Sequence, residues 1–176
     1  MSEEKTLKLD IGCGKNKQAG FKGIDSIDFE GVDYVLDVRK TPWVFEDSSV
    51  DEVHSSHFVE HLTGEERVDF FNELYRVMKK GAQARIVTPH WSHACAYGDP
   101  THKWPPMSEW FAYYLNKGWR DGNAPHTAYT CNFDFTIAGS WDPWLEIRNH
   151  ETKMFAMNRY VNSYRDLIVA ITAVKD

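Results

Sequence analysis

The sequence has few cysteines and no long apolar run. Its three cysteines, Cys13, Cys95 and Cys131, are too widely spaced for a disulfide framework or a cysteine-based zinc ribbon. No apolar stretch approaches the roughly 20 residues that a membrane span needs. The polar N-terminus MSEEKT also lacks the apolar core of a secretory signal. These absences lead us to expect a cytoplasmic protein with no membrane partner.

Basic residues are also in short supply. The chain has 20 Lys and Arg against 26 Asp and Glu, so its formal net charge is −6, and it contains no basic run. This balance argues against non-specific binding to nucleic acid or to an anionic membrane. With 176 residues, 42% of them hydrophobic, the chain is long enough for one α/β domain over residues 1–176 and too short for two.

Short apolar runs separated by turns predict a series of strands. They cover residues 7–11, 21–25, 34–37, 50–55, 84–88 and 167–174. Residues 63–80 have the periodicity of an amphipathic helix, with Thr63 and Glu66 as a capping box at its start and Gly81 after its end. We expect a second helix at 154–162. This alternation predicts a mainly parallel sheet with helices on its faces.

Residues 90 to about 144 have a different composition. This segment holds six of the seven tryptophans and five of the seven prolines, and its periodicity is weak. We interpret it as an inserted cap region that folds over one edge of the sheet, with some helix around 108–115. Most of its aromatic residues are expected to form a small core of their own. Trp91, Tyr97 and Trp104 are our candidates for lining a substrate pocket.

Carboxylates end three successive predicted strands, at Asp10, Asp25 and Asp37, and two glycines follow the first of them. In parallel α/β sheets, ligands bind beyond the carboxyl ends of the strands. Asp25 is placed to accept hydrogen bonds from a ribose diol and Asp37 from an exocyclic adenine amine, whereas Asp10 suits a ligand with an ammonium group. Asp25 and Asp37 are alternatively ordinary turn residues, and Gly12 and Gly14 alternatively form a simple tight turn after the strand. Lys17 stands near the position where a dinucleotide site has its third glycine.

Four segments carry a resemblance to a known family. LKLDIGCGKNK, FKGIDSID, VDYVLDV and VDEVHSSHFVEHL occur in the order of the first four motifs of class I S-adenosylmethionine-dependent methyltransferases. They most resemble the small methyltransferases that have Glu-His-Leu after the fourth strand. The resemblance implies a Rossmann-like fold with a mostly parallel seven-stranded sheet, helices on both faces and the aromatic-rich insertion after strand 5. It also implies S-adenosylmethionine as the cofactor.

The same resemblance assigns cofactor contacts. They are Asp10, Gly12, Cys13, Gly14, Asp25, Asp37, Val38, Ser55 and Ser56. Two features depart from the family pattern: Asn16 stands in place of a third glycine, and only 15 residues separate Asp10 from Asp25, which leaves room for a loop or about one helical turn. We therefore expect a more open cofactor pocket than is usual.

A histidine is the best candidate for a base that activates the methyl acceptor, because its pKa lies near neutrality. The candidates are His57, His61, His90 and His102. Each is alternatively a hydrogen-bonding scaffold residue. The sequence also contains two sets of residues that could bind a metal ion. One set is His57, Glu60 and His61, and the other is His90, His93 and His102. We nevertheless expect no metal.

We therefore predict an enzyme that transfers a methyl group from S-adenosylmethionine to an oxygen or nitrogen of a small or medium-sized acceptor. We expect the partner to be a small molecule and not a macromolecule. Two alternatives remain. The first alternative is a non-catalytic cofactor-binding or partner subunit of the same fold, and the short connection between the first two strands favours it. The second is a nucleotide-dependent oxidoreductase, which Lys17 and Asp10 disfavour.

Overall fold

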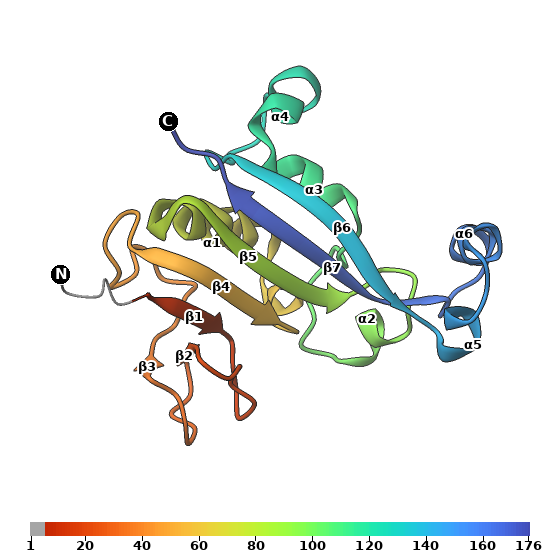
Figure 1. Ribbon diagram of the computed structural model, residues 1–176, viewed down its shortest axis with the longest axis horizontal. Helices are drawn as coiled ribbons and strands as arrows, with labels where there is room; N and C mark the ends of the chain where they lie inside the picture. The colour runs from red at the N-terminus through yellow and green to blue at the C-terminus, as the bar shows by residue number, and fades with distance from the viewer. Residues whose placement is uncertain (1–5) are drawn as a thin grey trace.

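The computed structural model describes residues 6–176, so residues 1–5 of the polar N-terminal stretch lie outside the described part. A seven-stranded sheet organises the chain, in the order β3-β2-β1-β4-β5-β7-β6 (Figure 1). Its strands are β1 (Lys8–Ile11), β2 (Lys22–Asp25), β3 (Tyr34–Val35), β4 (Val50–Ser56), β5 (Met78–Pro89), β6 (Phe133–Trp141) and β7 (Tyr164–Ala173). The first five strands run parallel, and β7 is antiparallel to both β5 and β6. The predicted Rossmann-like, mostly parallel sheet is confirmed.

The helix α1 (Gly64–Val77) begins where the sequence predicts it. Thr63 is its N-cap, and the capping box with Glu66 is formed in both directions. The helix ends three residues earlier than expected, because Met78 already pairs with Val50 as the first residue of β5. Gly81 therefore lies inside the strand, with a φ of 75°, and not after the helix. The sheet register, with an irregularity between Val50 and Glu52, overrides the local C-cap signal.

The helices α1 and α3 (Trp110–Leu115) lie behind the sheet in Figure 1. On the opposite face, a row of paired residues across β5, β7 and β6 is exposed, namely Arg85, Ala170 and Thr136. The expectation of helices on both faces therefore holds for only one face of these strands. The reason lies in the connections: β1 and β2 are joined by a loop, as the short spacing predicted, and β2, β3 and β4 are joined without a helix.

The inserted region is more regular than expected. Its segment 133–141 is the edge strand β6, which corrects the expectation that the whole of 90–144 is a cap. Alternate residues Phe133, Phe135 and Ile137 turn toward the core, the pattern of a strand with one buried face. The rest of the insertion forms α2 (Cys95–Gly98), α3, α4 (Lys117–Asn123) and connecting loops. The predicted 108–115 helix is α3, shorter by two residues at its start.

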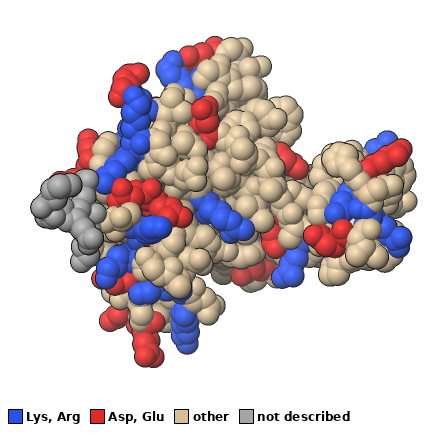
Figure 2. Space-filling view, viewed as in Figure 1, with Lys and Arg blue, Asp and Glu red and all other residues tan. Residues whose placement is uncertain are grey.

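Between β6 and β7 the chain makes an excursion away from the sheet. It contains α5 (Pro143–Glu146) and α6 (His150–Arg159), seen at the right of Figure 1. The helix predicted at 154–162 is therefore α6, which begins earlier and ends at Arg159. Figure 2 shows this excursion as a lobe projecting from the body of the molecule.

Charges are mixed over the face of the molecule seen in Figure 2. Lys and Arg side chains alternate there with Asp and Glu, and no broad basic patch is visible on this face of the described residues. None of the helices in residues 6–176 is both long enough and apolar enough to span a bilayer.

Candidate functional site

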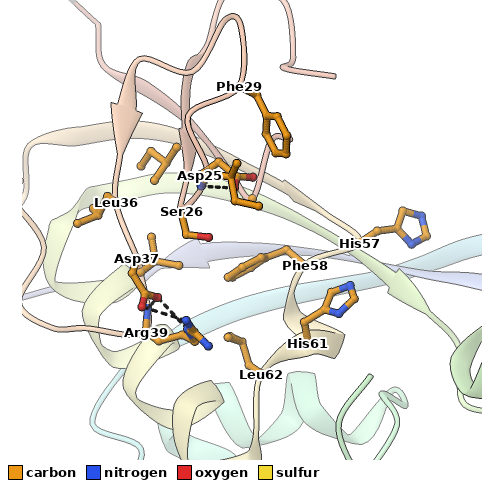
Figure 3. A pocket seen from close by; sticks show the side chains of 14 residues that line it. Asp25, Ser26, Phe29, Leu36, Asp37, Arg39, His57, Phe58, His61 and Leu62 are labelled. Atoms are coloured by element: carbon orange, nitrogen blue, oxygen red, sulfur yellow. Dashed lines mark hydrogen bonds and ion pairs between the residues drawn. The ribbon is translucent and has the colours of Figure 1, made fainter. Parts of the chain in front are cut away.

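A cleft of about 440 Å³ opens at the carboxyl ends of β1, β2 and β3 and beside the residues that follow β4. In Figure 3, Asp25 and Phe29 lie on one side of it, Asp37 and Arg39 on another, and His57 and His61 opposite them, with Phe58 between. Its other lining residues are Gly12, Ile24, Ser26, Ile27, Leu36, Val38 and Leu62. This volume lies within the range of about 300–1,000 Å³ for small-molecule and cofactor sites.

Gly12 forms part of the cleft wall because it has no side chain. Its φ is 70°, and a Cβ built at this position would come within 2.5 Å of the Phe58 ring. The backbone N–H of Gly12 is bonded to the carbonyl of Ile24 at 2.9 Å, which holds the turn after β1 against β2. Glycine is therefore required here both by the backbone conformation and by the close approach of Phe58.

Asp25 lies at the end of β2 and holds the loops around the cleft. One carboxylate oxygen accepts the N–H of Gly14 at 2.9 Å, and the other accepts the N–H of Ile27 at 3.0 Å. A carboxylate oxygen can accept more than one hydrogen bond, so Asp25 keeps acceptor capacity for a ligand hydroxyl. The residue is thus fixed in orientation before any ligand arrives.

Asp37 faces the cleft in an ion pair with Arg39. The guanidinium Nε lies 2.8 Å from one carboxylate oxygen, and Nη2 lies 3.0 Å from the other. This pairing holds the pKa of Asp37 below its usual value, so the carboxylate is ionised at neutral pH. Arg39 also lines the cleft and was not among the predicted cofactor contacts. Its position in the sequence could have indicated this role, because it directly follows the predicted contacts Asp37 and Val38.

Five of the nine predicted cofactor contacts do not line the cleft. Asp10 is buried behind it, where its carboxylate accepts the N–H of Gln18 at 2.6 Å and lies 2.9 Å from Nδ1 of His54. Ser55 is also buried and donates to the carbonyl of Ile11 at 3.0 Å. The other three are Cys13, Gly14 and Ser56.

Cys13 and Gly14 support the cleft from the loop after β1. The pKa of the Cys13 thiol is raised, first by burial and then by the charges of Asp10 and Asp25. The N–H of Gly14 is bonded to Asp25, as described above. The structure therefore brings Gly12, Asp25, Asp37 and Val38 together at one cleft and places the other five candidates around it.

The four candidate histidines fall into two groups. His57 and His61 line the cofactor cleft, and the ring of His102 packs edge-on against that of His61, with centroids 4.8 Å apart. His57 has a φ of 55° and is half exposed, and the Glu60 carboxylate beside it raises its pKa. His90 is separate: it is buried, with Nδ1 at 2.7 Å from the Ser92 hydroxyl and Nε2 at 3.1 Å from Glu109.

His90 lies at the base of a second cleft, of about 730 Å³. Trp91, Tyr97 and Trp104, the three residues predicted to line a substrate pocket, all border this cleft. Their side chains remain exposed, Trp104 to 79%, so the cap does not exclude water as expected of a closed lid. Trp110, Glu109 and Met157 border the same cleft and were not predicted. Met157 comes from α6, so no local pattern could place it there.

Comparisons with known proteins bear on the family and the fold. Residues 17–86 match the family model of a methyltransferase domain. A similar solved structure is a SAM-dependent methyltransferase from Archaeoglobus fulgidus, with a TM-score of 0.70 and 22% identity over 95% of this chain and 86% of that one. The chain has the fold of class I methyltransferases. No curated protein matches it by sequence.

Two further structures similar to this methyltransferase fold contain the cofactor or its product. Phosphoethanolamine N-methyltransferase 2 of Haemonchus contortus, in complex with S-adenosylmethionine, is 16% identical over 97% of this chain and 49% of that one, with a TM-score of 0.54. Geranyl diphosphate C-methyltransferase of Streptomyces coelicolor, with Mg²⁺, geranyl diphosphate and S-adenosylhomocysteine, is 17% identical over 97% and 73%, with a TM-score of 0.58. The matched family and these neighbours support an enzyme that uses S-adenosylmethionine.

Proposed function

We propose that this protein transfers a methyl group from S-adenosylmethionine to an oxygen or nitrogen atom of a small or medium-sized acceptor. The observation that carries the proposal is the cleft in which Gly12, Asp25 and Asp37 meet at the carboxyl ends of neighbouring strands. These residues fit the cofactor: Gly12 leaves space at the wall, and two fixed carboxylates supply acceptors for ribose hydroxyls and an adenine amine. S-adenosylmethionine, when bound, supplies a methyl group activated by positive sulfur.

The protein's own part in such a reaction is mainly to position the acceptor. The second cleft, bordered by Trp91, Tyr97 and Trp104, supplies flat apolar surfaces on which a small organic acceptor can stack. His57 and His61 stand on the cleft side that leads toward the cap, where His57 can accept a proton from the acceptor. The similar enzymes from Haemonchus contortus and Streptomyces coelicolor act on small phosphorylated molecules, which supports a small-molecule acceptor here.

Ligand titration tests the cofactor assignment. We expect S-adenosylhomocysteine to bind at one site per chain by isothermal titration calorimetry and NAD not to bind. Binding of NAD alone would favour an oxidoreductase. Binding of neither ligand would favour a partner subunit. The Asp37–Arg39 ion pair supports this alternative, because Arg39 already contacts both carboxylate oxygens of Asp37, the predicted adenine contact.

Asp25→Ala tests the ribose contact. We expect this variant to bind S-adenosylhomocysteine more weakly by about 1.5–3 kcal/mol, the value of hydrogen bonds to a charged group. The control is Asp28→Ala, which removes an exposed carboxylate three residues away that does not line the cleft. Thermal unfolding of both variants separates a binding effect from loss of the bonds that Asp25 makes to Gly14 and Ile27. An unchanged dissociation constant in folded Asp25→Ala would place the ribose elsewhere.

A further inference from the structure

A buried carboxylate whose oxygens accept no hydrogen bond from the described residues lies next to the cofactor cleft, beside His57 and His61. Glu60 belongs to the short 3₁₀ helix η1 (Val59–His61), and its side chain is only 5% exposed. Neither of its carboxylate oxygens accepts a hydrogen bond from any described residue, although Nδ1 of His57 lies 3.3 Å from Oε1. Buried carboxylates are normally hydrogen-bonded, paired or bound to a metal, because an isolated buried charge is costly. The half-exposed ring of His57 is thus the only close charge partner that the described residues give these two oxygens in the ion-pair contacts, and both oxygens keep capacity to bind a ligand of positive charge.

Two imidazoles converge on this carboxylate. His61 is the next residue of η1, and His102 comes from the cap loop. The loop is held there by a hydrogen bond of 2.8 Å from the N–H of Lys103 to the carbonyl of Glu60. One ligand atom from each of Glu60, His61 and His102 lies within 4.8 Å of the other two. In the sequence, Glu60 and His61 group with His57, and His102 groups with His90 and His93, because only the docking of the cap loop brings His102 beside η1.

The hydrogen bonds of both imidazoles involve Nδ1 and leave Nε2 as the atom that can bind a cation, although Nε2 of His102 also lies 4.0 Å from the Asp99 carboxylate. Nδ1 of His102 lies 3.1 Å from the carbonyl oxygen of Ala96, which can only accept, so Nδ1 carries the proton. The Thr101 hydroxyl donates to Asp99 at 2.7 Å and therefore accepts from Nδ1 of His61 at 2.9 Å. With the proton on Nδ1 in each ring, Nε2 is the atom that offers a lone pair to a metal ion. Bonds of this kind, from the second ring nitrogen, orient most metal-binding histidines.

We propose that Glu60, His61 and His102 form a binding site for a divalent transition-metal ion. Two imidazoles and one carboxylate suit Zn²⁺, Fe²⁺, Mn²⁺ or Co²⁺ better than Mg²⁺ or Ca²⁺, which prefer oxygen ligands alone. Ligands on one ion of this size lie roughly 3.4 Å apart, so the side chains close by about 1 Å on binding. This proposal replaces the expectation of no metal.

The site borders the cofactor cleft through His61 and belongs through His102 to the loop that also carries a residue of the second cleft. His61 lines the cofactor cleft, and His102 lies two residues before Trp104 of the second cleft. Three protein ligands leave coordination positions open, as in catalytic metal sites. If the protein is a methyltransferase as proposed above, these positions are placed to hold an anionic oxygen of the acceptor. The acceptor class we infer is thus a molecule with a carboxylate, phosphate or phenolate oxygen close to the methylated atom.

Co²⁺ titration tests the site without any measurement of methyl transfer. The protein, free of added histidines and stripped with a chelator, is titrated with Co²⁺ and followed by its visible d–d absorption. We expect saturation at one ion per chain. His61→Ala and His102→Ala are expected to weaken binding at least 10-fold, whereas the control His126→Ala, which removes an exposed histidine elsewhere, leaves it unchanged. Binding that fails to saturate, or that survives both ligand substitutions, overturns the proposal.

Glu60→Gln provides a second readout that a purely structural role would not produce. It keeps the shape of the side chain but removes a buried charge whose close partner is the half-exposed ring of His57, so the metal-free variant is expected to melt at the same temperature as the parent or higher. Zn²⁺ is expected to raise the melting temperature of the parent and not that of the variant. A large loss of metal-free stability would instead show that Glu60 is structural, against the proposal.

The metal and methyltransferase proposals fail separately. Parent protein that binds Co²⁺ but not S-adenosylhomocysteine would refute the proposed function and retain the metal site. Parent protein that binds S-adenosylhomocysteine but not Co²⁺ would refute the metal site and retain the proposed function.

Discussion

Substitution of Gly12 by alanine directly tests the geometry of the cofactor cleft. Two costs are expected. Alanine at a φ of 70° adopts a left-handed conformation, which costs about 1–2 kcal/mol. Its Cβ would also lie 2.5 Å from Cδ2 and 2.7 Å from Cβ of Phe58. Because the Phe58 Cβ is involved, a rotamer change cannot relieve the clash, and the main chain must move at a cost of about 1–3 kcal/mol.

Gly14→Ala is the matched control for this substitution. Gly14 lies in the same loop with a φ of 50°, and nothing lies within 4 Å of a Cβ built there. We therefore expect Gly14→Ala to lower the free energy of unfolding by about 1–2 kcal/mol and Gly12→Ala by about 2–5 kcal/mol. Both values are measured by urea unfolding.

The movement of Phe58 also predicts an effect on binding. Gly12 and Phe58 line the same cleft, so displacement of either alters the space for a ligand. Gly12→Ala is expected to weaken S-adenosylhomocysteine binding in calorimetry by more than 10-fold relative to Gly14→Ala. Equal stability losses in the two variants, or parental affinity in folded Gly12→Ala, would refute the reasoning.

Two further predictions concern the structure around the clefts. Arg67 is buried and donates to the carbonyls of Val59, Lys103 and Pro105. Arg67→Met is therefore expected to destabilise the protein by about 2–4 kcal/mol in urea unfolding and to expose the cap loop to proteolysis. The control Arg85→Met, at an exposed position, is expected to change stability by less than about 0.5 kcal/mol. Lys17 and other partners lower the pKa of Asp33, so Asp33 stabilises the folded state above about pH 4 and loses this effect as pH falls further. The stability gap between parent and Asp33→Asn, about 1–2 kcal/mol at pH 6, should therefore narrow toward pH 2 in thermal unfolding; a constant gap would contradict this assignment.

Local signals in the sequence predicted the elements that depend on local structure. The Thr63–Glu66 capping box set the start of α1, because both of its hydrogen bonds lie within one helical turn. Strand ends at Asp25 and Asp37 likewise marked the cleft, since parallel strands bring their carboxyl ends to one edge of a sheet. These positions needed no knowledge of distant contacts.

Features that depend on long-range packing were missed. The strand β6 has the alternating pattern of Phe133, Phe135 and Ile137, but the surrounding aromatic residues obscured it, and only pairing with β7 makes it part of the sheet. The end of α1 was set by the pairing of Met78 with Val50, which no local signal encodes. The proximity of His102 to His61 also depends on the cap loop docking against η1.

Asp10 and Glu60 show how partners distinguish a structural carboxylate from a ligand-binding one. Both are buried near the same end of the sheet, at 2% and 4% exposure. The oxygens of Asp10 are engaged by Gln18 and His54, so the surrounding chain accounts for its burial and its role in holding the loop after β1. The oxygens of Glu60 have no hydrogen-bond partner among the described residues and are approached only by the half-exposed ring of His57 in the ion-pair contacts, while the imidazoles of His61 and His102 lie close enough to share a metal ion with them. The sequence motif predicted that Asp10 contacts a ligand. A buried carboxylate needs hydrogen bonds or a positive charge, and because the chain supplies them to Asp10, the physical environment favours Glu60 as the ligand-binding residue.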